Sequence, residues 1–289
     1  MSKYLSILLL CCLPAWLWAG ENYRFRVYLK DKGNDGYRVE EPEVFLSKKA
    51  IERRAKNNIA VTDADFPISR SYIEMLSGTG AIPVVQSKWF ATVVVESPDS
   101  AVVEQLRQLA IVDSVKWIWK GNLRFPAGEK GEGRFVSEDE PLRNEYGYAH
   151  RQIKMLNGVK LHEAGFRGEG MRVAVIDAGF MNADRMSAFD SLRLLGTYNV
   201  VFPGRSVFTG DDHGTKVLSC LAADIPGVMV GTAPKASYLL LKSEDSDSEY
   251  PVEEDYWTAA VEYADSAGVD VISSSLGYFV FDTDELSYD

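Results

Sequence analysis

The spacing of hydrophobic positions along the chain predicts two domains. In the first part, from Tyr23 to Lys120, alternating apolar and polar residues predict strands, and a period near 3.6 predicts helices. The predicted strands span 23–30, 81–97 (one strand or two) and 113–120, and the predicted helices span 47–58 and 99–110. This order of elements is typical of a small open α/β sandwich.

The hydrophobic period stops between Gly121 and Tyr146. The stretch GEKGEGRFVSEDEPLRNEYG consists mainly of glycine and charged residues, a composition typical of an exposed linker. Proteases cut preferentially in such segments. The sequence therefore predicts a domain at 20–120, a linker at 121–146 and a second domain at 147–289.

The second domain combines longer apolar strands with helices. A helix is predicted at 152–165, closed by Gly165, which can adopt the left-handed conformation at a helix end. Strands are then predicted at 171–180, 236–243 and 269–278, with helices at 213–224 and 252–268 between them. Uninterrupted apolar strands that alternate with helices indicate a parallel sheet buried on both faces.

The N-terminus has the pattern of a secretory signal peptide. A charged start at Lys3 is followed by an apolar run from Tyr4 to Trp18 and the small residues Ala19 and Gly20. The run is about 15 residues long and is too short to span a membrane, which takes roughly 20. We therefore predict a signal peptide at 1–19, no membrane span, and a secreted, periplasmic or extracellular protein. Cys11 leaves a lipid anchor open as an alternative.

The charge and the cysteine content of the chain exclude two further features, a nucleic-acid partner and an internal disulfide. The net charge of −11 and the absence of a basic block argue against a nucleic-acid partner. After signal removal Cys220 is the only cysteine, so an internal disulfide is excluded. We expect the Cys220 side chain to be buried as a small hydrophobe.

Two polar residues occupy positions suited to chemistry. Asp177 directly follows the apolar strand, at the edge where functional groups collect in open α/β sheets. His213 stands where a loop becomes a helix, followed by Gly214, which allows another backbone to approach closely. Asp177 could instead cap a helix or turn. His150 and His162 are expected to face solvent.

Four segments carry a resemblance to a known family. VAVIDAGF, DDHGTKVLS, GTAPKAS and VDVISSSLG occur in this order between Met171 and Tyr278, and together they resemble the subtilisin-type (subtilase, peptidase S8) serine peptidases. The upstream domain resembles a subtilase propeptide. The resemblance implies an α/β fold: an incomplete doubly wound parallel sheet of subtilisin type, preceded by a small α+β ferredoxin-like pro-domain.

The resemblance also implies roles for the site residues. Asp177 would orient the imidazole, and His213 would act as the general base. The segment Ser275, Leu276 and Gly277 would pair with an extended substrate and form the wall of its specificity pocket. The implied partners are a polypeptide substrate and the chain's own propeptide.

The nucleophile is the missing part of this pattern. In the family it follows the histidine and stands in a Gly-Thr-Ser segment. The Gly-Thr pairs of this chain are followed by Gly80, Tyr198, Lys216 and Ala233. Ser273, Ser274 and Ser275 crowd the end of the last predicted strand, but Ser275 matches the family's substrate-binding segment, and the resemblance places both the nucleophile and the oxyanion asparagine after Asp289. The predicted function is a secreted serine endopeptidase that lacks the serine here. The alternative is a truncated or degenerate peptide-binding module.

An acidic cluster follows the strand at 236–243 and allows three interpretations. Glu244, Asp245, Asp247 and Glu249 could form a solvated loop, select basic substrate side chains, or bind calcium. We expect no other metal and no cofactor. A nucleotide-binding site is disfavoured, because the Gly168 and Gly170 pair precedes the strand instead of following it.

Overall fold

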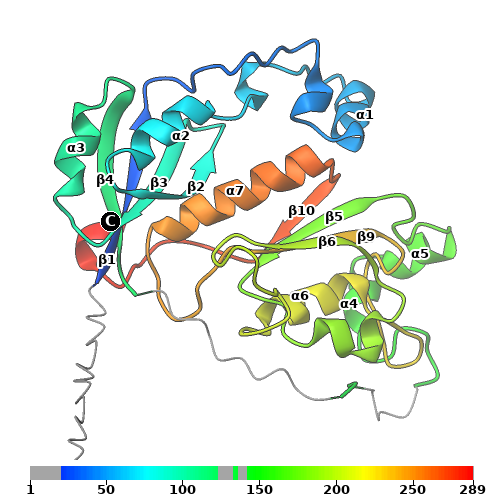
Figure 1. Ribbon diagram of the computed structural model, residues 1–289. Coiled ribbons are helices and arrows are strands. Elements are labelled where there is room, and N and C mark those ends of the chain that lie inside the picture. Colours follow the sequence, from blue (N-terminus) through cyan, green and yellow to red (C-terminus); the bar gives the residue numbers. More distant parts are fainter. Residues whose placement is uncertain (1–20, 123–132, 136–141, 289) are drawn as a thin grey trace, which may run out of the picture.

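A computed structural model describes residues 21–122, 133–135 and 142–288. The predicted signal peptide at 1–19 and most of the predicted linker at 121–146 lie outside these residues. Two sheets lie on opposite sides of one long helix, α7 (Val252–Ala267), as Figure 1 shows. No helix of the described segments is long and apolar enough to cross a membrane.

The first sheet is antiparallel, with the strand order β2-β3-β1-β4. Its strands are β1 (Asn22–Leu29), β2 (Ile82–Ser87), β3 (Thr92–Ser97) and β4 (Val112–Gly121), and its helices are α1 (Lys48–Lys56), α2 (Arg70–Ser77) and α3 (Val102–Gln108). Val27 of β1 packs in one core with Leu76 of α2 and Leu106 of α3. This arrangement is the predicted α+β pro-domain. The eight-residue helix α2 was not predicted from the sequence.

The second sheet is parallel, with the order β10-β5-β9-β6. Its strands are β5 (Arg172–Asp177), β6 (Arg193–Asn199), β9 (Ser237–Lys242) and β10 (Val271–Ser274). The parallel sheet predicted from the apolar strands is confirmed. The strand β6 was missed, because it lies at the edge and its residues are mostly exposed, which gives no continuous apolar run.

Helices cover both faces of this sheet. Ala174 and Ile176 of β5 share a core with α7, while Val173 and Val175 pack toward Leu218 of α6 (His213–Ala222). Successive strand residues point to opposite faces, so both faces of β5 are buried and its residues from Val173 to Ile176 are all apolar. Helices α6 and α7 therefore pack on opposite faces of the sheet.

The helix predicted at 152–165 is divided into α4 (His150–Met155) and α5 (Gly158–Glu163). Asn157 separates the two with a left-handed backbone, at φ 57°. Gly165 adopts φ 89°, which confirms the predicted left-handed closure. A hairpin of β7 (Asp224–Ile225) and β8 (Met229–Val230) and the 3₁₀ turns η1 (Pro42–Val44), η2 (Asp63–Asp65), η3 (Ala183–Arg185), η4 (Ser187–Phe189) and η5 (Asp284–Leu286) complete the described elements.

Two side chains differ from their predicted exposure. His162 is buried, because its Nδ1 accepts from Tyr146 Oη at 3.2 Å and its Nε2 donates to Thr232 O at 2.9 Å. The expectation that His162 faces solvent is therefore wrong. His150, for which the same was expected, is half-buried. Cys220 is exposed, since it lies on the outer side of α6, so the expectation that it is buried is also wrong.

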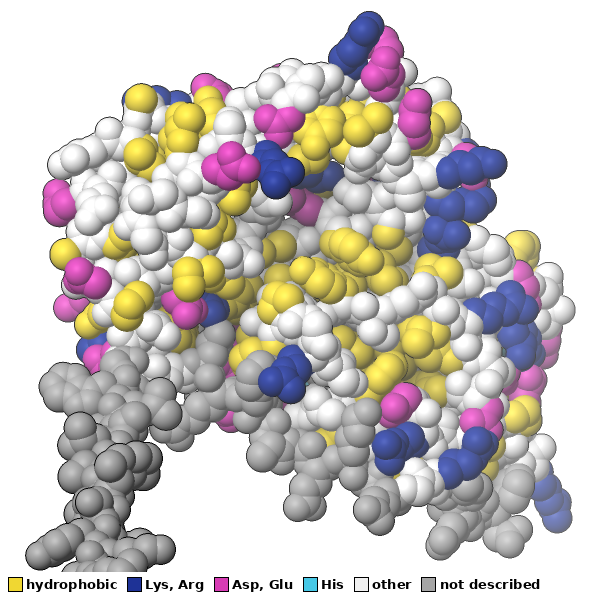
Figure 2. Space-filling view, viewed as in Figure 1, with side chains coloured by type: hydrophobic (Ala, Val, Ile, Leu, Met, Phe, Trp, Pro, Cys, Tyr) yellow, Lys and Arg dark blue, Asp and Glu magenta, His cyan; other side chains and the backbone are white. Residues whose placement is uncertain are grey.

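The pro-domain sheet packs against α7 by its second face. Ile118 and Trp119 of β4 lie in the same buried cluster as Tyr256 and Ala260 of α7. The helix α7 is therefore buried between both sheets (Figure 1). Figure 2 shows hydrophobic side chains gathered across the middle of the face that it depicts, between the two halves of the molecule.

Candidate active site

Asp177 lies at the carboxyl end of β5 and is completely buried. Its backbone carbonyl accepts from Ser243 N at 3.1 Å, which joins it to the end of the neighbouring strand β9. Its Oδ1 accepts from Ala178 N at 2.8 Å, whereas its Oδ2 has no hydrogen-bond partner among the described residues. The strand thus places a buried carboxylate at its end. Among the described residues, Oδ1 takes part in two hydrogen bonds, with Ala178 N and His213 Nδ1, and Oδ2 takes part in none.

His213 is the first residue of α6, and its side chain is half exposed. Asp211 Oδ1 accepts from the His213 backbone N–H at 2.7 Å and fixes the entry into the helix. A β-carbon on Gly214 would lie 2.4 Å from Gly179 O and 2.9 Å from the β-carbon of Asp177. Only glycine lets the helix start approach the end of β5 this closely.

The two side chains form a direct pair, with His213 Nδ1 at 2.7 Å from Asp177 Oδ1. The hydrogen bond and the charge of Asp177 raise the pKa of His213 above its usual value, although partial burial opposes this. Burial raises the pKa of Asp177, and the His213 contact offsets part of that rise. A carboxylate on Nδ1 fixes the tautomer that leaves Nε2 free to accept a proton.

His213 lines an open cavity of about 520 Å³ together with Leu276. Of the predicted substrate-binding residues, Leu276 is therefore brought to the histidine. Ser275 and Gly277 are exposed on either side of Leu276 and do not line the cavity. No serine hydroxyl of the described segments bonds to His213. Ser274 Oγ instead accepts from Trp257 Nε1 at 2.9 Å.

The acidic loop after β9 forms another wall of this cavity. Glu244 and Asp245 are buried, so the interpretation as a solvated loop is wrong for them, whereas Asp247 is exposed. Burial raises the pKa of Glu244 to about 7, while hydrogen bonds from Tyr278 and Ser243 oppose the rise. No group of three His, Cys, Asp or Glu residues in the described parts of the chain is arranged to hold a metal ion.

Sequence reasoning missed Glu253, which stands in the first turn of α7 and lines the same cavity. Its side chain is only 1% exposed, and its Oε1 accepts from Asp245 N at 2.8 Å. The signal was present in the sequence, because Glu253 and Asp255 fall among the apolar positions of the predicted helix at 252–268. A buried acid requires a partner, so such positions indicate a site or an interface.

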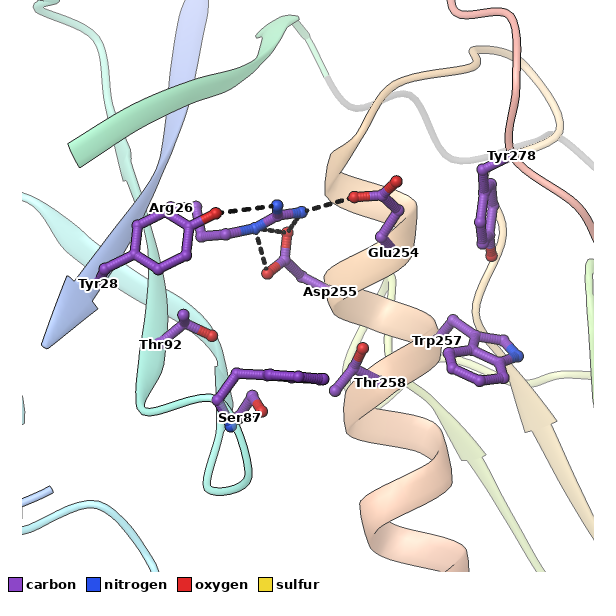
Figure 3. Close-up of a pocket in the computed structure, with 10 residues that line it drawn as sticks. Arg26, Tyr28, Ser87, Thr92, Glu254, Asp255, Trp257, Thr258 and Tyr278 are labelled. Atoms are coloured by element: carbon purple, nitrogen blue, oxygen red, sulfur yellow. Dashed lines mark hydrogen bonds and ion pairs between the residues drawn. The ribbon is translucent and has the colours of Figure 1, made fainter. Parts of the chain in front are cut away.

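Asp255 is a buried acid of this kind at an interface, the one between α7 and the pro-domain. Arg26 of β1 reaches Asp255 in a two-pronged contact, with Nη2 at 2.6 Å from Oδ2 and Nε at 2.8 Å from Oδ1 (Figure 3). Arg26 Nη2 also lies 3.1 Å from Glu254 Oε2. Burial raises the pKa of Asp255 to about 6, and Arg26 opposes that rise.

Two more acids of α7 bind the pro-domain. Asp265 pairs with both Arg53 and Arg54 of α1, the latter at 2.6 Å. Glu262 accepts from Ser87 Oγ at 2.6 Å and from Lys88 N at 2.9 Å, in the turn after β2. Along the length of α7, its acids thus pair with arginines of the pro-domain or accept hydrogen bonds from its hydroxyl and backbone N–H groups.

The fold and the site define a subtilisin-like α/β protein with an N-terminal propeptide domain. Residues 24–132 match the family model described as "Peptidase S8 propeptide domain, Bacteroidota", and residues 168–287 match "Subtilase family". Residues 168–287 therefore form a subtilase-family domain, and the domain before it matches a propeptide domain of the same peptidase family.

Curated relatives agree with this assignment. The chain is 32% identical to subtilisin E of Bacillus subtilis over 150 residues, which is 50% of this chain and 36% of that protein. It is 30% identical to the major intracellular serine protease of Bacillus subtilis over 141 residues, 43% of this chain and 40% of that protein. The chain thus spans less than half the length of these relatives.

Solved structures share the fold at low identity. Fervidolysin from Fervidobacterium pennivorans, a keratinolytic enzyme related to subtilisin, matches with a TM-score of 0.51 and 15% identity over 91% of this chain and 37% of its own. The epidermin leader peptide processing serine protease of Staphylococcus aureus matches with a TM-score of 0.53 and 12% identity, over 92% of this chain and 52% of its own.

The raised pKa of His213 predicts the pH dependence of any reaction in which it is the base. A base must be neutral, so kcat/KM should rise with pH through the pKa of His213, with a midpoint above the usual value of about 6.5. NMR titration of the imidazole should give the same midpoint. Asp177→Asn removes the charge that raises this pKa, so the titration midpoint should then move to lower pH. An unchanged midpoint in that variant would contradict the assigned pair.

Proposed function

We propose that this chain is the pro-domain and the Asp–His part of a secreted serine endopeptidase. The observation that carries the proposal is the 2.7 Å contact between His213 Nδ1 and buried Asp177, within the segment that matches the subtilase family. The localisation rests on the signal-peptide pattern of residues 1–19.

In the proposed reaction, His213 Nε2 takes the proton of a serine hydroxyl as that oxygen attacks the carbonyl carbon of a peptide bond. The same nitrogen then gives the proton to the leaving amine, and water hydrolyses the acyl-enzyme by the same route. Asp177 holds the imidazole in one tautomer and stabilises its charged form. The reaction uses no cofactor.

We assign the nucleophilic serine to the protein's sequence beyond Asp289. The described serines support this, because none of their hydroxyls bonds to His213. Ser275, Leu276 and Gly277 are proposed to bind substrate next to the base, with Leu276 as the residue that already lines its cavity. The alternative function, a peptide-binding module without catalytic activity, is not favoured by the family matches.

The pro-domain is proposed to act as an inhibitor and folding aid until the linker is cut. Its support is the contact with α7, which joins buried apolar side chains to the Arg26–Asp255 and Arg54–Asp265 pairs. Such a contact stabilises α7, which in turn supports β5 and Asp177.

The test of the proposed activity is hydrolysis of a quenched fluorescent peptide library by the complete protein after removal of its pro-domain. We expect cleavage that a serine-directed phosphonate inhibitor blocks and that His213→Ala abolishes. Cleavage that survives His213→Ala would reject the proposed mechanism.

A further inference from the structure

The cavity beside His213 has more acidic groups than its neighbours can neutralise. Asp211, Glu244, Asp245, Asp247, Glu249, Glu253 and Asp282 line it, and no lysine or arginine of the described residues does. Lys242 is buried and donates to the backbone of Ala178, which lines the cavity, and buried Arg24 acts on Asp245 while pairing with Glu96. These two positive charges are fewer than the seven acids. An acidic cavity of this kind favours a cation.

One buried atom indicates a ligand independently of the charge count. Glu253 Oε2 is buried and has no hydrogen-bond partner among the described residues, although its side chain lines the cavity. The other oxygen, Oε1, is used by Asp245 N. A buried carboxyl group with an unpaired oxygen is costly whether it is charged or protonated, and a cationic donor that enters the cavity would pair that oxygen.

We propose, on the basis of the proposed peptidase function, that this cavity binds a basic side chain, arginine or lysine, of the polypeptide substrate. Glu253 Oε2 accepts from the cationic head, and Glu249 adds charge at the cavity wall. The same cavity contains His213 and Leu276, so the side chain binds within reach of the base. Its occupant therefore determines which peptide bond is presented.

The spread of the carboxylates favours a long organic cation over a metal ion. No three of the described acids lie close enough to coordinate one ion. An arginine side chain has five N–H donors in a flat head on a flexible stem and can reach separated carboxylates. Gly121, at the end of β4, lines a second pocket together with Asp245 and Asp247, so the pro-domain already reaches this acidic loop.

Burial, followed by the charge of Glu244, raises the pKa of Glu253 to about 9. Without a cation the carboxyl therefore carries its proton at neutral pH. A bound guanidinium favours the charged form, so binding should release a proton.

The test uses the complete protein and peptides that differ only by arginine or its neutral isostere citrulline, placed in turn at four positions before the cleaved bond. At one position we expect kcat/KM to be at least about tenfold higher for arginine. Glu253→Gln should remove this ratio and Glu249→Gln should reduce it, and the readout is the ratio of the two peptides measured within each variant, not the absolute rate. Glu163→Gln, an exposed acid on α5, is the matched control and should keep the ratio.

Equal cleavage of both peptides, or an arginine preference that survives Glu253→Gln, would overturn the proposal while leaving the peptidase function intact. If no peptide is cleaved, the peptidase function fails, and calorimetry with the same peptides tests the cavity alone. Tighter binding of arginine, lost in Glu253→Gln, then supports the cavity, and equal binding overturns it. Calcium chloride that binds the wild type and not Glu253→Gln would assign the cavity to a metal and overturn the proposal.

Discussion

Replacing Asp177 by asparagine should lower the kcat of the complete protein by about 10⁴-fold, the scale known for loss of the orienting carboxylate in a serine peptidase triad. The amide has the same shape, but it can donate to Nδ1 and thereby stabilise the wrong tautomer of His213. Steady-state hydrolysis of a fluorescent peptide measures the effect. Circular dichroism should show an unchanged fold.

The matched control is Asp212→Asn, one residue before the histidine. Asp212 is part-exposed, and its carboxylate pairs with Lys216 at 2.7 Å instead of with the imidazole. An exposed pair is worth little, so kcat should change by less than about fivefold. A loss of only tenfold in Asp177→Asn would mean that a different carboxylate orients His213.

Replacing Arg26 by alanine should weaken binding of the separated pro-domain to the catalytic domain by about 10²- to 10⁴-fold. Asp255 would be left buried without its partner, and removal of one member of a buried pair costs about 3–5 kcal/mol. The dissociation constant is measured as the inhibition constant of the added pro-domain. Arg107→Ala, which breaks an exposed pair with Glu104, is the control and should change it little.

A double-mutant cycle separates this pair from general damage to the pro-domain. If Arg26 and Asp255 act on each other, the double variant with both replaced by alanine should bind more tightly than the sum of the single losses implies. Strict additivity of the two losses would show that the pair does not couple the domains, and the proposed docking mode would then be wrong.

The parts of the fold that were predicted from the sequence have strong local signals. The strand β5 is apolar from Val173 to Ile176 because both of its faces are buried, and Asp177 ends that run. Glycine at Gly214 likewise indicated a close approach, which the contact with Gly179 explains. Such features are readable because one residue reports directly on its own environment.

The parts that were missed depend on distant partners. The buried position of His162 follows from Tyr146 and Thr232, and neither contact has a local signal. The partners of Asp255 and Asp265 could not be predicted from the sequence, because the arginines that pair with them lie more than 200 positions away. The strand β6 was overlooked for a related reason, since an edge strand needs apolar residues on fewer sides.

The central claim is that Asp177 and His213 activate a serine outside residues 1–289, and a fluorophosphonate probe tests it most directly. The complete protein is labelled after removal of its pro-domain, and the modified peptide is identified by mass spectrometry. We predict one labelled serine, located after Asp289, and loss of labelling in His213→Ala. Labelling of a serine within this chain, such as Ser275, or labelling that persists in His213→Ala, would contradict the claim.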